Sequence, residues 1–533
     1  MLRWKETLAS LALLTTAIAC QQTAVVRSLQ PFLPPTIQAV GQPVSAVNYS
    51  DDLQIARSGA MRKRNADLTW LEELLQARHR PAIRAGSLQL VFDMPNRVTI
   101  SGAEPLVQAC ATDLDAITAA LSRTVQVTVY QLPLADGKLP NTHLDGAELR
   151  QLVDGARPLW TTHARTRSGG SVELRRCNWP SYARDLEPEI AEKSAIDAPK
   201  FDRLFVGTSC SATVHSLPGE RLLLHGSWLA SRLVEMREQL TGNGGPSIDL
   251  PHVQILAASF SGLIDSGGAL VVAARSGQRK EAGVQLLVSA RYSSPAASMP
   301  QGIGAIPITA WQAAYTAHGT PGPARFPGED AFAPESESAL LAPADVCSLL
   351  GAFGKCKTPT GFLIGTADGQ EIQAAEATIE QLCRANGQGF SVHVTRDGTA
   401  GIGGIQIIQP TLAGLACHAF VGSERAHIAG FDAELASGAN AYNPTVDIAR
   451  SGVWSWCTLA APASGGGHFV DGLWRSAEPA TARMRSLTTK PPLLVECTDY
   501  KASAWPWSGS ITANRPHELS PGMRIQIRER QPR

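Results

Sequence analysis

A nucleophilic hydroxyl is the first chemistry that the sequence could carry, in the segment Gly207 to Ser211. A serine nucleophile on a strand-to-helix turn needs the pattern Gly-x-Ser-x-Gly, because the glycines allow the tight turn that exposes the hydroxyl. Ser209 has Gly207 before it, but Ser211 stands where the second glycine is required. We therefore interpret this segment as a turn that enters a strand.

The loops that bind phosphates are also incomplete. A P-loop has the pattern Gly-x-x-x-x-Gly-Lys-Ser/Thr, whereas Gly351 to Cys356 has only two residues between its glycines and ends in cysteine. Gly401 to Gly404 precedes the apolar run Ile405 to Ile408, while a dinucleotide loop follows a strand and opens a helix. The sequence therefore predicts no cofactor.

Metal ligands at binding spacing are missing as well. The 12 histidines include no His-Glu-x-x-His motif, and the nine cysteines beyond Cys20 include no Cys-x-x-Cys pair. We expect no metal site and no enzymatic activity. One or two disulfides are expected if the chain is exported, and Cys347 with Cys356 is the pair that we name.

Tryptophan side chains offer a different chemistry, the stacking of sugar rings or of partner side chains. Four of them gather in the C-terminal part of the chain: Trp454, Trp456, Trp505 and Trp507. Burial in a core is the favoured interpretation of such residues. The four tryptophans are nevertheless the candidate binding residues for carbohydrate or peptidoglycan.

Composition narrows the class of partner. The 533 residues are 44% hydrophobic and 18% charged, which is typical of folded chains. The 47 Lys and Arg residues balance 47 Asp and Glu residues, so no overall positive field attracts a phosphate backbone. We expect protein partners, including further copies of this chain, and no nucleic acid.

The N-terminus has the layout of an export signal. Residues 1–20 begin with basic residues, continue through the apolar run Leu8 to Ala19, and reach small residues before Cys20. The apolar run is shorter than the roughly 20 residues that span a bilayer. The end of the signal resembles the lipobox of bacterial lipoproteins, although Ala17 stands where that motif prefers Leu. Cys20 is therefore a candidate lipid attachment site and the one expected membrane contact; ordinary cleavage after Ala19 and an uncleaved segment are the alternatives.

The rest of the chain divides into two similar parts. We assign residues 21–85 to a stalk and an N-terminal helical segment, residues 86–293 to repeat 1, residues 294–345 to a linker rich in Pro, Gly and Ala, and residues 346–533 to repeat 2.

A helix followed by a strand opens each repeat. In repeat 1, apolar residues spaced three and four apart run from Val107 to Leu121, and alternating valines follow from Val125. Adding 265 carries Val107 to Ile372 and Val125 to Phe390, where the same pattern recurs. The equal distance from helix to strand indicates a duplication.

Three further blocks recur in the same order. Glu189 to Gly207 aligns with Glu434 to Gly452 without a gap, with identical Glu, Ala, Pro, Asp and Gly positions. The later blocks pair His225-Gly-Ser-Trp228 with Asp471-Gly-Leu-Trp474, and Ser266-Gly-Gly268 with Ser520-Pro-Gly522.

The expected fold class is α+β and rich in β-structure, with two repeated units. Each unit is a small helix-strand subdomain followed by an antiparallel β-rich part. Short strands are expected at these runs: Arg221 to Leu224, His252 to Ala258, Ala269 to Ala274, Val284 to Tyr292, Ile405 to Ile408 and Trp454 to Leu459.

The order of these features resembles that of bacterial secretins, the ring-forming outer-membrane gates of type II and type III secretion and of pili. The resemblance rests on the helix with its alternating strand, the turn at Gly207, and the Gly-Gly before an apolar strand at Gly267 to Ala273. It covers Leu88 to Tyr292 and, more faintly, Gly361 to Arg530. Neither part has the Val-Pro, Gly, Ile-Pro signature of secretins, and neither has a lipid-facing amphipathic hairpin.

The resemblance implies a protein that keeps the secretin scaffold and not the gate. We therefore expect an exported, non-enzymatic scaffold or assembly component of the bacterial periplasm or outer membrane, which acts through protein contacts and as a homo-oligomer. The alternative is a secreted carbohydrate- or peptidoglycan-binding protein that uses the tryptophans.

Overall fold

The computed structural model describes most of the chain in separate ranges. These are residues 22–28, 69–93, 97–134, 140–191, 194–217, 219–240, 247–276, 283–307, 356–357, 362–366, 368–386, 389–398, 404–413, 415, 417–436, 439–459, 467–486 and 494–529. The expected export signal, Cys20, Cys347 and most of the expected linker lie outside these residues.

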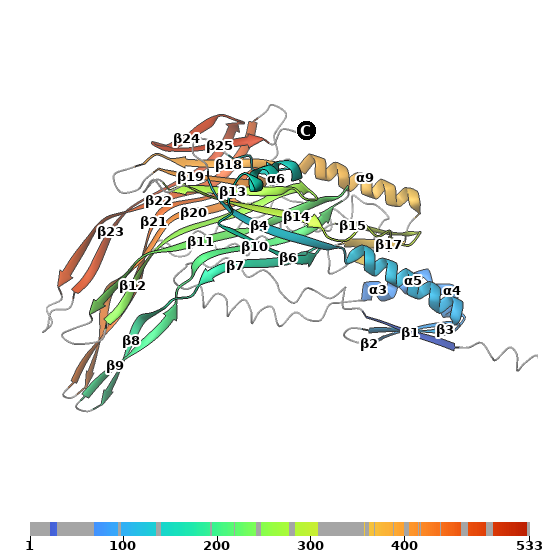
Figure 1. Ribbon diagram of the computed structural model, residues 1–533, viewed down its shortest axis with the longest axis horizontal. Helices are drawn as coiled ribbons and strands as arrows, with labels where there is room; N and C mark the ends of the chain where they lie inside the picture. Colours follow the sequence, from blue (N-terminus) through green and yellow to red (C-terminus); the bar gives the residue numbers. More distant parts are fainter. Residues whose placement is uncertain are drawn as a thin grey trace, which may run out of the picture.

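A small unit forms the N-terminal end of the elongated molecule (Figure 1). Its sheet has the order β1-β3-β2, with β1 at Gln22–Ser28, β3 at Arg97–Ala103 and β2 at Leu88–Asp93. Helices α3 (Thr69–Arg78), α4 (Arg80–Arg84) and α5 (Glu104–Leu121) accompany it.

Strand β1 corrects the expected stalk, because residues 22–28 pair with β3 along their whole length. Arg27 of β1 also donates two hydrogen bonds to Asp115 of α5, at 2.8 and 2.9 Å. The sequence predicts a stalk here because the segment has no periodicity, and the strand forms because a partner lies more than sixty residues later in the chain.

The helix predicted from apolar spacing is confirmed in α5. Its side chains Val107, Cys110, Leu114, Ile117 and Leu121 are all buried in the core of the small unit. The second predicted helix is confirmed as α9, at Gly369–Asn386, where Ala375 and Ile379 are buried. A residue spacing of three and four places such side chains on one face, which a neighbouring layer then covers.

Two large antiparallel sheets make up the body of the molecule. The first, which we name the long sheet, has the order β23-β22-β21-β20-β12-β11-β10-β7. Its strands are β7 (Gly170–Asn178), β10 (Val206–Leu217), β11 (Arg221–Leu240), β12 (Ser247–Asp265), β20 (Cys417–Ala436), β21 (Ala439–Leu459), β22 (Gly467–Ser486) and β23 (Leu494–Thr512).

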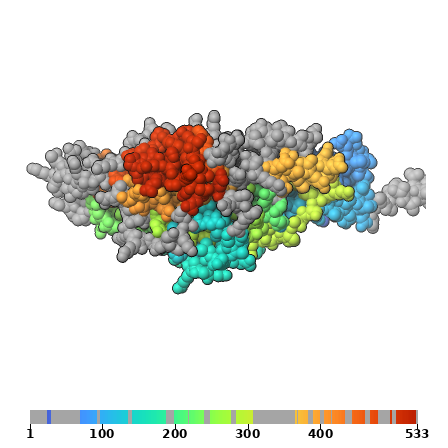
Figure 2. Space-filling model, turned by 90° about the horizontal axis from the view of Figure 1, so that it is seen from above, coloured from blue at the N-terminus to red at the C-terminus, as the bar shows by residue number. Residues whose placement is uncertain are grey.

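The second sheet, which we name the short sheet, has the order β24-β25-β18-β19-β13-β14-β4-β6, with β5 paired to β13. Its strands are β4 (Thr124–Pro133), β5 (His143–Leu144), β6 (Trp160–Arg167), β13 (Ala269–Ser276), β14 (Val284–Tyr292), β18 (Gly389–Arg396), β19 (Ile405–Leu412), β24 (Pro516–Ser520) and β25 (Met523–Glu529). Figure 2 shows β24 and β25, in red, on a face well away from the blue N-terminal unit.

The main core lies between these two sheets. Val127 of β4 and Val392 of β18 enter it from the short sheet, and Trp228 of β11 and Trp474 of β22 enter it from the long sheet. Both tryptophan side chains are fully buried, as the favoured interpretation of tryptophans requires. Helix α6 (Gly146–Asp154) begins with a capping box, in which Asp145 and Glu148 satisfy each other's backbone N–H groups.

A hairpin extends the ladder of β7 and β10 beyond the core. It consists of β8 (Ser181–Ala191) and β9 (Ser194–Arg203). Leu186 of β8 packs with Ile248 of β12 and Ile428 of β20 in one buried cluster, so this hairpin lies across strands of the long sheet. In Figure 1 it lies at the end of the molecule opposite to β1.

The strands are much longer than the short runs expected from the sequence. Strand β11 has 20 residues and β21 has 21. The extra length lies in stretches without regular alternation, such as Arg232 to Leu240, whose pairing with β12 continues to the contact Leu240↔Ser247. Apolar alternation marks only the part of a strand that faces the core, so the sequence pattern underestimates strands that extend past it.

Part of the expected linker is also ordered. Strand β15 (Ile303–Pro307) pairs with β17 (Phe362–Thr366), which pairs with β16 (Cys356–Lys357). Among the described residues, no helix is both long enough and apolar enough to cross a membrane.

Candidate functional site

Unpaired sheet edges are the most extended functional feature of the molecule. Strands β23 and β7 end the long sheet, and β24 and β6 end the short sheet, with no further strand paired to them among the residues described. An edge strand presents a row of backbone N–H and C=O groups that can pair with another strand. All four edges are therefore candidate binding surfaces.

The junction between the two halves of each sheet shows how such edges pair in this chain. In the long sheet, β12 pairs with β20 from His252↔Arg425 to Ala258↔Ala419. In the short sheet, β13 pairs with β19 from Ala273↔Ile408 to Ser276↔Ile405. Both junctions join a strand before residue 280 to a strand after residue 400, so they hold the two parts of the chain together.

A buried carboxylate strengthens the junction of the long sheet. Glu496 of β23 has a side chain only 1% exposed, and it accepts a hydrogen bond of 2.8 Å from Arg237 of β11. Arg425 of β20 donates to the other carboxylate oxygen. A buried charge is stable only when it is paired and hydrogen-bonded, and here two guanidinium groups from different strands supply that.

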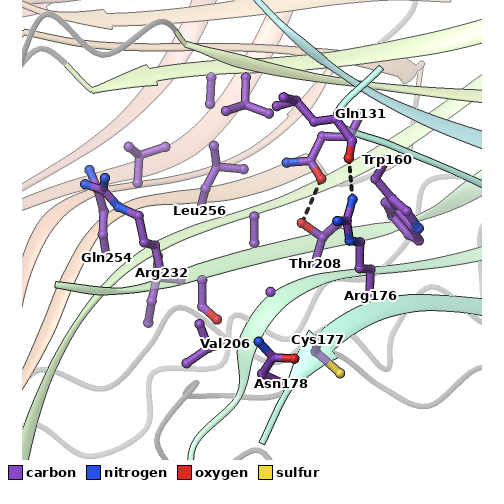
Figure 3. A pocket seen from close by; sticks show the side chains of 18 of the residues that line it. Gln131, Trp160, Arg176, Cys177, Asn178, Val206, Thr208, Arg232, Gln254 and Leu256 are labelled. Carbon is purple, nitrogen blue, oxygen red and sulfur yellow. Dashed lines mark hydrogen bonds between the residues drawn. The ribbon is translucent and has the colours of Figure 1, made fainter. Parts of the chain in front are cut away.

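A pocket of about 730 Å³ opens between the two sheets, beyond the apolar core (Figure 3). Gln131 of β4 and Trp160 of β6 lie on the side of the short sheet. Thr208 of β10, in the long sheet, donates a 2.9 Å hydrogen bond to Gln131 Oε1. Two arginines of the long sheet, Arg176 and Arg232, also line it. The pocket therefore has both apolar and cationic walls.

The candidate tryptophans do not form one cluster. Trp454 is buried on one face of the long sheet, where its ring stacks on Phe420 with centroids 4.6 Å apart. Trp456, two residues along the same strand, points to that same face. Trp505 and Trp507 instead pack against the core on the other face. The expected binding cluster is thus divided by the sheet, because the two pairs lie on different strands, β21 and β23, and face opposite sides.

The incomplete nucleophile motif, Gly207 to Ser211, lies within strand β10 of the long sheet, so the predicted strand is present but the predicted turn is wrong. Ser209 and Cys210 are buried in β10, and burial raises the pKa of the Cys210 thiol. A thiol held in its neutral form is a poor nucleophile.

Sequence reasoning missed one serine-histidine contact, between Ser391 and His393 of β18. Both side chains are buried, and burial lowers the pKa of His393 to about 3, with Arg528 adding to the effect. A histidine with so low a pKa is a weak general base near neutral pH. The contact is therefore structural. A serine two residues from a histidine on one strand is the only signal that the sequence carries for it.

Metal chemistry finds no support in the described residues, which contain no group of three or more His, Cys, Asp or Glu side chains placed to hold an ion. His215 and His225 approach each other with 3.2 Å between their Nε2 atoms. Burial lowers the pKa of both, that of His225 to about 4.

Comparisons with known proteins give structural likenesses only. No family model matches the chain, and no curated protein matches it. The secretin InvG of the Salmonella SPI-1 type III secretion injectisome is 10% identical, with 40% of this chain and 78% of that chain covered and a TM-score of 0.21.

Two other solved structures are similar to the same degree. The type IV competence pilus secretin PilQ of V. cholerae is 10% identical over 55% of this chain and 83% of its own, with a TM-score of 0.22. A chain of the ETEC pilotin-secretin complex AspS-GspD is 9% identical over 62% of this chain and 86% of its own, with a TM-score of 0.21. With TM-scores this low, the function has to be argued from this chain's own edges and contacts.

Proposed function

We propose that this chain is an exported, non-enzymatic scaffold or assembly component of the bacterial cell envelope, with a role like that of secretins. It acts by pairing its free sheet edges with those of further copies. In this proposal residues 1–20 direct export, and Cys20 either carries the lipid or follows the cleavage site. The observation that carries the proposal is the order of strands in the two sheets.

Each sheet consists of two equal halves in tandem. In the long sheet, β23-β22-β21-β20 is followed by β12-β11-β10-β7, and in the short sheet β24-β25-β18-β19 is followed by β13-β14-β4-β6. In the long sheet, β20, β21, β22 and β23 thus hold the same relative places as β7, β10, β11 and β12. In the short sheet, β18, β19, β24 and β25 hold the same relative places as β4, β6, β13 and β14. This order supports a duplication, because an unrelated pair of domains would not repeat two sheet orders at once.

The bounds of the elements agree with the same alignment. Adding 265 carries α5 (Glu104–Leu121) onto α9 (Gly369–Asn386). Adding 246 carries β11 onto β22, and adding 247 carries β12 onto β23, at both ends of each strand. Strand β9 begins at Ser194 and β21 at Ala439, a difference of 245.

Matched glycines support the alignment in detail. Gly207 has φ +145° and Gly452 has φ +146°, a conformation that side chains rarely adopt. At each of them a Cβ would lie 2.6 Å from a neighbouring Cα, that of Cys177 or of Gly422. Both positions thus need glycine for the same reason, close approach of the adjacent strand.

One of the sequence matches is wrong. Gly267 and Gly268 precede β13, whereas Gly522 lies between β24 and β25. Since β24 occupies the place of β13, the two glycine turns are not equivalent. The mistake arose because Gly267 and Gly522 both have positive φ, at +93° and +78°, and tight turns before apolar strands look alike in sequence.

The tandem order makes the free edges complementary. Strand β23 occupies the place of β12, and β7 occupies the place of β20. If β12 and β20 pair within the chain, β23 of one chain and β7 of the next can pair in the same way. The same reasoning joins β24 to β6. Such a contact is head-to-tail, and repeated head-to-tail contacts give a ring when the rotation closes and a filament when it does not.

The junction within the chain also predicts the register between chains. Within the chain Ile255 of β12 lies opposite Gly422 of β20. Adding 247 carries Ile255 of β12 to Ala502 of β23, and subtracting 245 carries Gly422 of β20 to Cys177 of β7. Ala502 of one chain should therefore lie opposite Cys177 of the next. Position 177 already holds a cysteine with a thiol that is partly accessible.

A cross-linking experiment tests this register. The variant Ala502→Cys should form a ladder of disulfide-linked oligomers on a non-reducing gel after mild oxidation, because directly opposed cysteines on paired strands can bond. Ser503→Cys is the matched control, since its side chain points to the opposite face of the sheet. A chain that stays monomeric at high concentration, or equal cross-linking by both variants, would refute the proposal.

The alternative function, carbohydrate binding by Trp454, Trp456, Trp505 and Trp507, gains no support from the geometry. Stacking on a sugar needs aromatic faces on one accessible surface. The two pairs instead lie on opposite faces of the long sheet, and Trp454 is 3% exposed.

A further inference from the structure

The hairpin of β8 and β9 matches the outer part of the hairpin of β20 and β21, which consists of residues 426–436 and 439–448. Adding 245 carries every pair of the β8–β9 ladder onto a pair of the β20–β21 ladder. The match includes a β-bulge at the same place, where the first ladder skips Arg184 and the second skips Ala429. The two hairpins are therefore equivalent, and their surroundings can be compared residue by residue.

Within the chain, β8 of the first half lies against β21 of the second half. The amide nitrogen of Asn443, in the orientation that satisfies both of its polar atoms, donates to the backbone oxygen of Leu186 and to Asp185 Oδ1. Leu186 is buried in a hydrophobic cluster against which Val446 of β21 also packs. The first half of the molecule thus covers part of β21.

The matching strand, β9, lacks this cover at three alternate positions. All three side chains are exposed: Pro199, Phe201 and Arg203. Their counterparts in β21 are buried or half-buried: Pro444, Val446 and Ile448. Phe201 is 70% exposed, more than any other large hydrophobic side chain in the described part of the chain. A single exposed apolar residue is common on protein surfaces, but here the equivalent position shows what a covered strand looks like.

The tandem order identifies the segment that would cover β9. Within the chain, the hairpin of one half covers the hairpin of the half that follows it. If copies join head to tail, the half that precedes the first half of one copy is the second half of another, and its outer part of β20 holds the place of β8. We propose that Pro199, Phe201 and Arg203 form a docking surface for β20 of a second copy of this chain. This inference rests on the proposed pairing of sheet edges and adds a contact away from those edges.

The same numbering gives the side chains that meet. Adding 245 carries Leu186 to Phe431 and Phe201 to Val446. Since Leu186 and Val446 belong to one cluster, Phe431 of one copy should contact Phe201 of the next. Phe431 is half-buried, so part of its surface remains available for such a contact. Two phenylalanines bury a large apolar area, and paired aromatic rings add a favourable interaction of their own.

A mixing experiment with two cysteine variants tests the contact. Both full-length chains also carry Cys177→Ser, which removes a partly accessible thiol. One chain has Phe201→Cys and the other has Phe431→Cys. After the two are mixed by dilution and concentrated together, a short bismaleimide should cross-link them into dimers, because the contact joins unlike segments of two copies. Each variant alone should give only the background of the Cys177→Ser chain.

A charge at the docking surface should weaken the association of copies. Phe201→Asp is expected to raise the dissociation constant about tenfold or more, because it removes a buried aromatic side chain from the contact. Sedimentation measures this change. Thermal unfolding of the variant should match that of the wild type, since Phe201 is exposed within one chain. The matched control is Phe469→Asp on β22, which is 48% exposed and lies outside the contact, and it should associate like the wild type.

The Ala502→Cys variant, measured in parallel, separates this inference from the proposed function. A ladder from Ala502→Cys, together with no cross-linking above background in the mixture, would show that the edges pair and that the docking surface is wrong. Unchanged association of Phe201→Asp would also overturn the inference. Loss of binding to phosphatidylcholine vesicles in Phe201→Asp, with no cross-linking in the mixture, would assign Phe201 to a membrane instead. Absence of oligomers in every sample would remove both proposals.

Discussion

Cys417 and Cys457 lie directly opposite each other in the ladder of β20 and β21, with 3.2 Å between their sulfur atoms. Both side chains are 1% exposed. In the other half of the molecule the matching pair is Val172 and Ala212, which are likewise opposite each other and buried. Buried, opposed side chains at these ladder positions are thus not cysteines in both places, and only Cys417 and Cys457 bring two thiols together.

We expect Cys417 and Cys457 to form a disulfide when the chain folds in an oxidising buffer. The hydrogen bond that the Cys457 thiol makes to Cys417, together with burial, raises the pKa of Cys457, so the folded dithiol should react slowly. An exported chain would acquire the bond during folding. Refolding with oxidised glutathione, followed by alkylation and mass spectrometry, should show both thiols protected and a free energy of unfolding about 2–4 kcal/mol higher than after reduction.

The double variant Cys417→Val with Cys457→Ala is the control, because it installs the residues of the other half. Its stability should be the same in oxidising and reducing buffers. Full alkylation of both wild-type thiols after oxidative refolding would contradict this prediction.

Acid should begin to destabilise the fold at pH values well above those at which carboxylates are usually protonated. Burial lowers the pKa of His393 to about 3 and that of His418 to about 4, against 6.5 for an ordinary histidine. Between pH 6.5 and about 4 the unfolded chain binds more protons than the folded chain, so the free energy of unfolding falls as the pH falls. Each such histidine contributes up to about 1.4 kcal/mol per pH unit.

Urea denaturation at pH 7 and at pH 4.5 measures the loss, and His393→Gln should reduce it. An exposed histidine, His163 on β6, provides the control, since His163→Gln should leave the pH dependence unchanged. Equal pH dependence in the wild type and in His393→Gln would show that the buried imidazole is not responsible.

Removing the buried carboxylate of Glu496 should weaken the junction of the long sheet. Glu496→Gln replaces the shared carboxylate of Arg237 and Arg425 by a neutral amide with one acceptor oxygen. We expect a loss of about 1–3 kcal/mol in unfolding free energy, since both arginines are partly exposed. Arg237→Gln should cost less, because Arg425 still pairs with Glu496. Chemical denaturation gives both values, and a loss no larger for Glu496→Gln than for Arg237→Gln would argue against a shared role.

The matched glycines should be intolerant of any side chain. In Gly207→Ala and in Gly452→Ala, a new Cβ would overlap the adjacent strand and occupy a disfavoured φ, so we expect each to cost roughly 3 kcal/mol or more. Gly267→Ala separates the two causes, since Gly267 has φ +93° but open space around its Cβ position. Thermal unfolding should rank it between the wild type and the other two variants.

The sequence predicts those elements whose buried faces have a regular period. The three- and four-residue spacing from Val107 to Leu121 predicts α5, and the alternation at Val125, Val127 and Val129 predicts the inward face of β4. In both cases the period of the helix or strand places the apolar side chains on the one face that is buried. The signal therefore lies within the segment itself.

Longer-range features could not be predicted in the same way. The mixed stretch Arg232 to Leu240 has no regular alternation, and it continues a strand because β12 returns beside it. Strand β1 depends on a partner in β3, and the pocket depends on Gln131, Arg176 and Arg232 from three strands in two sheets. The grouping of the four tryptophans could not be predicted, because the sequence does not show that β21 and β23 turn these side chains to opposite faces of the sheet.

The junctions β12–β20 and β13–β19 each join two parts of a single polypeptide. Their formation is therefore intramolecular, and its rate does not change with dilution. If copies associate edge to edge, only every second contact has to be made by collision. Each chain contributes two halves to the sheets, so any closed particle would hold an even number of halves. The order of its rotational symmetry would be the number of chains, which is half the number of halves.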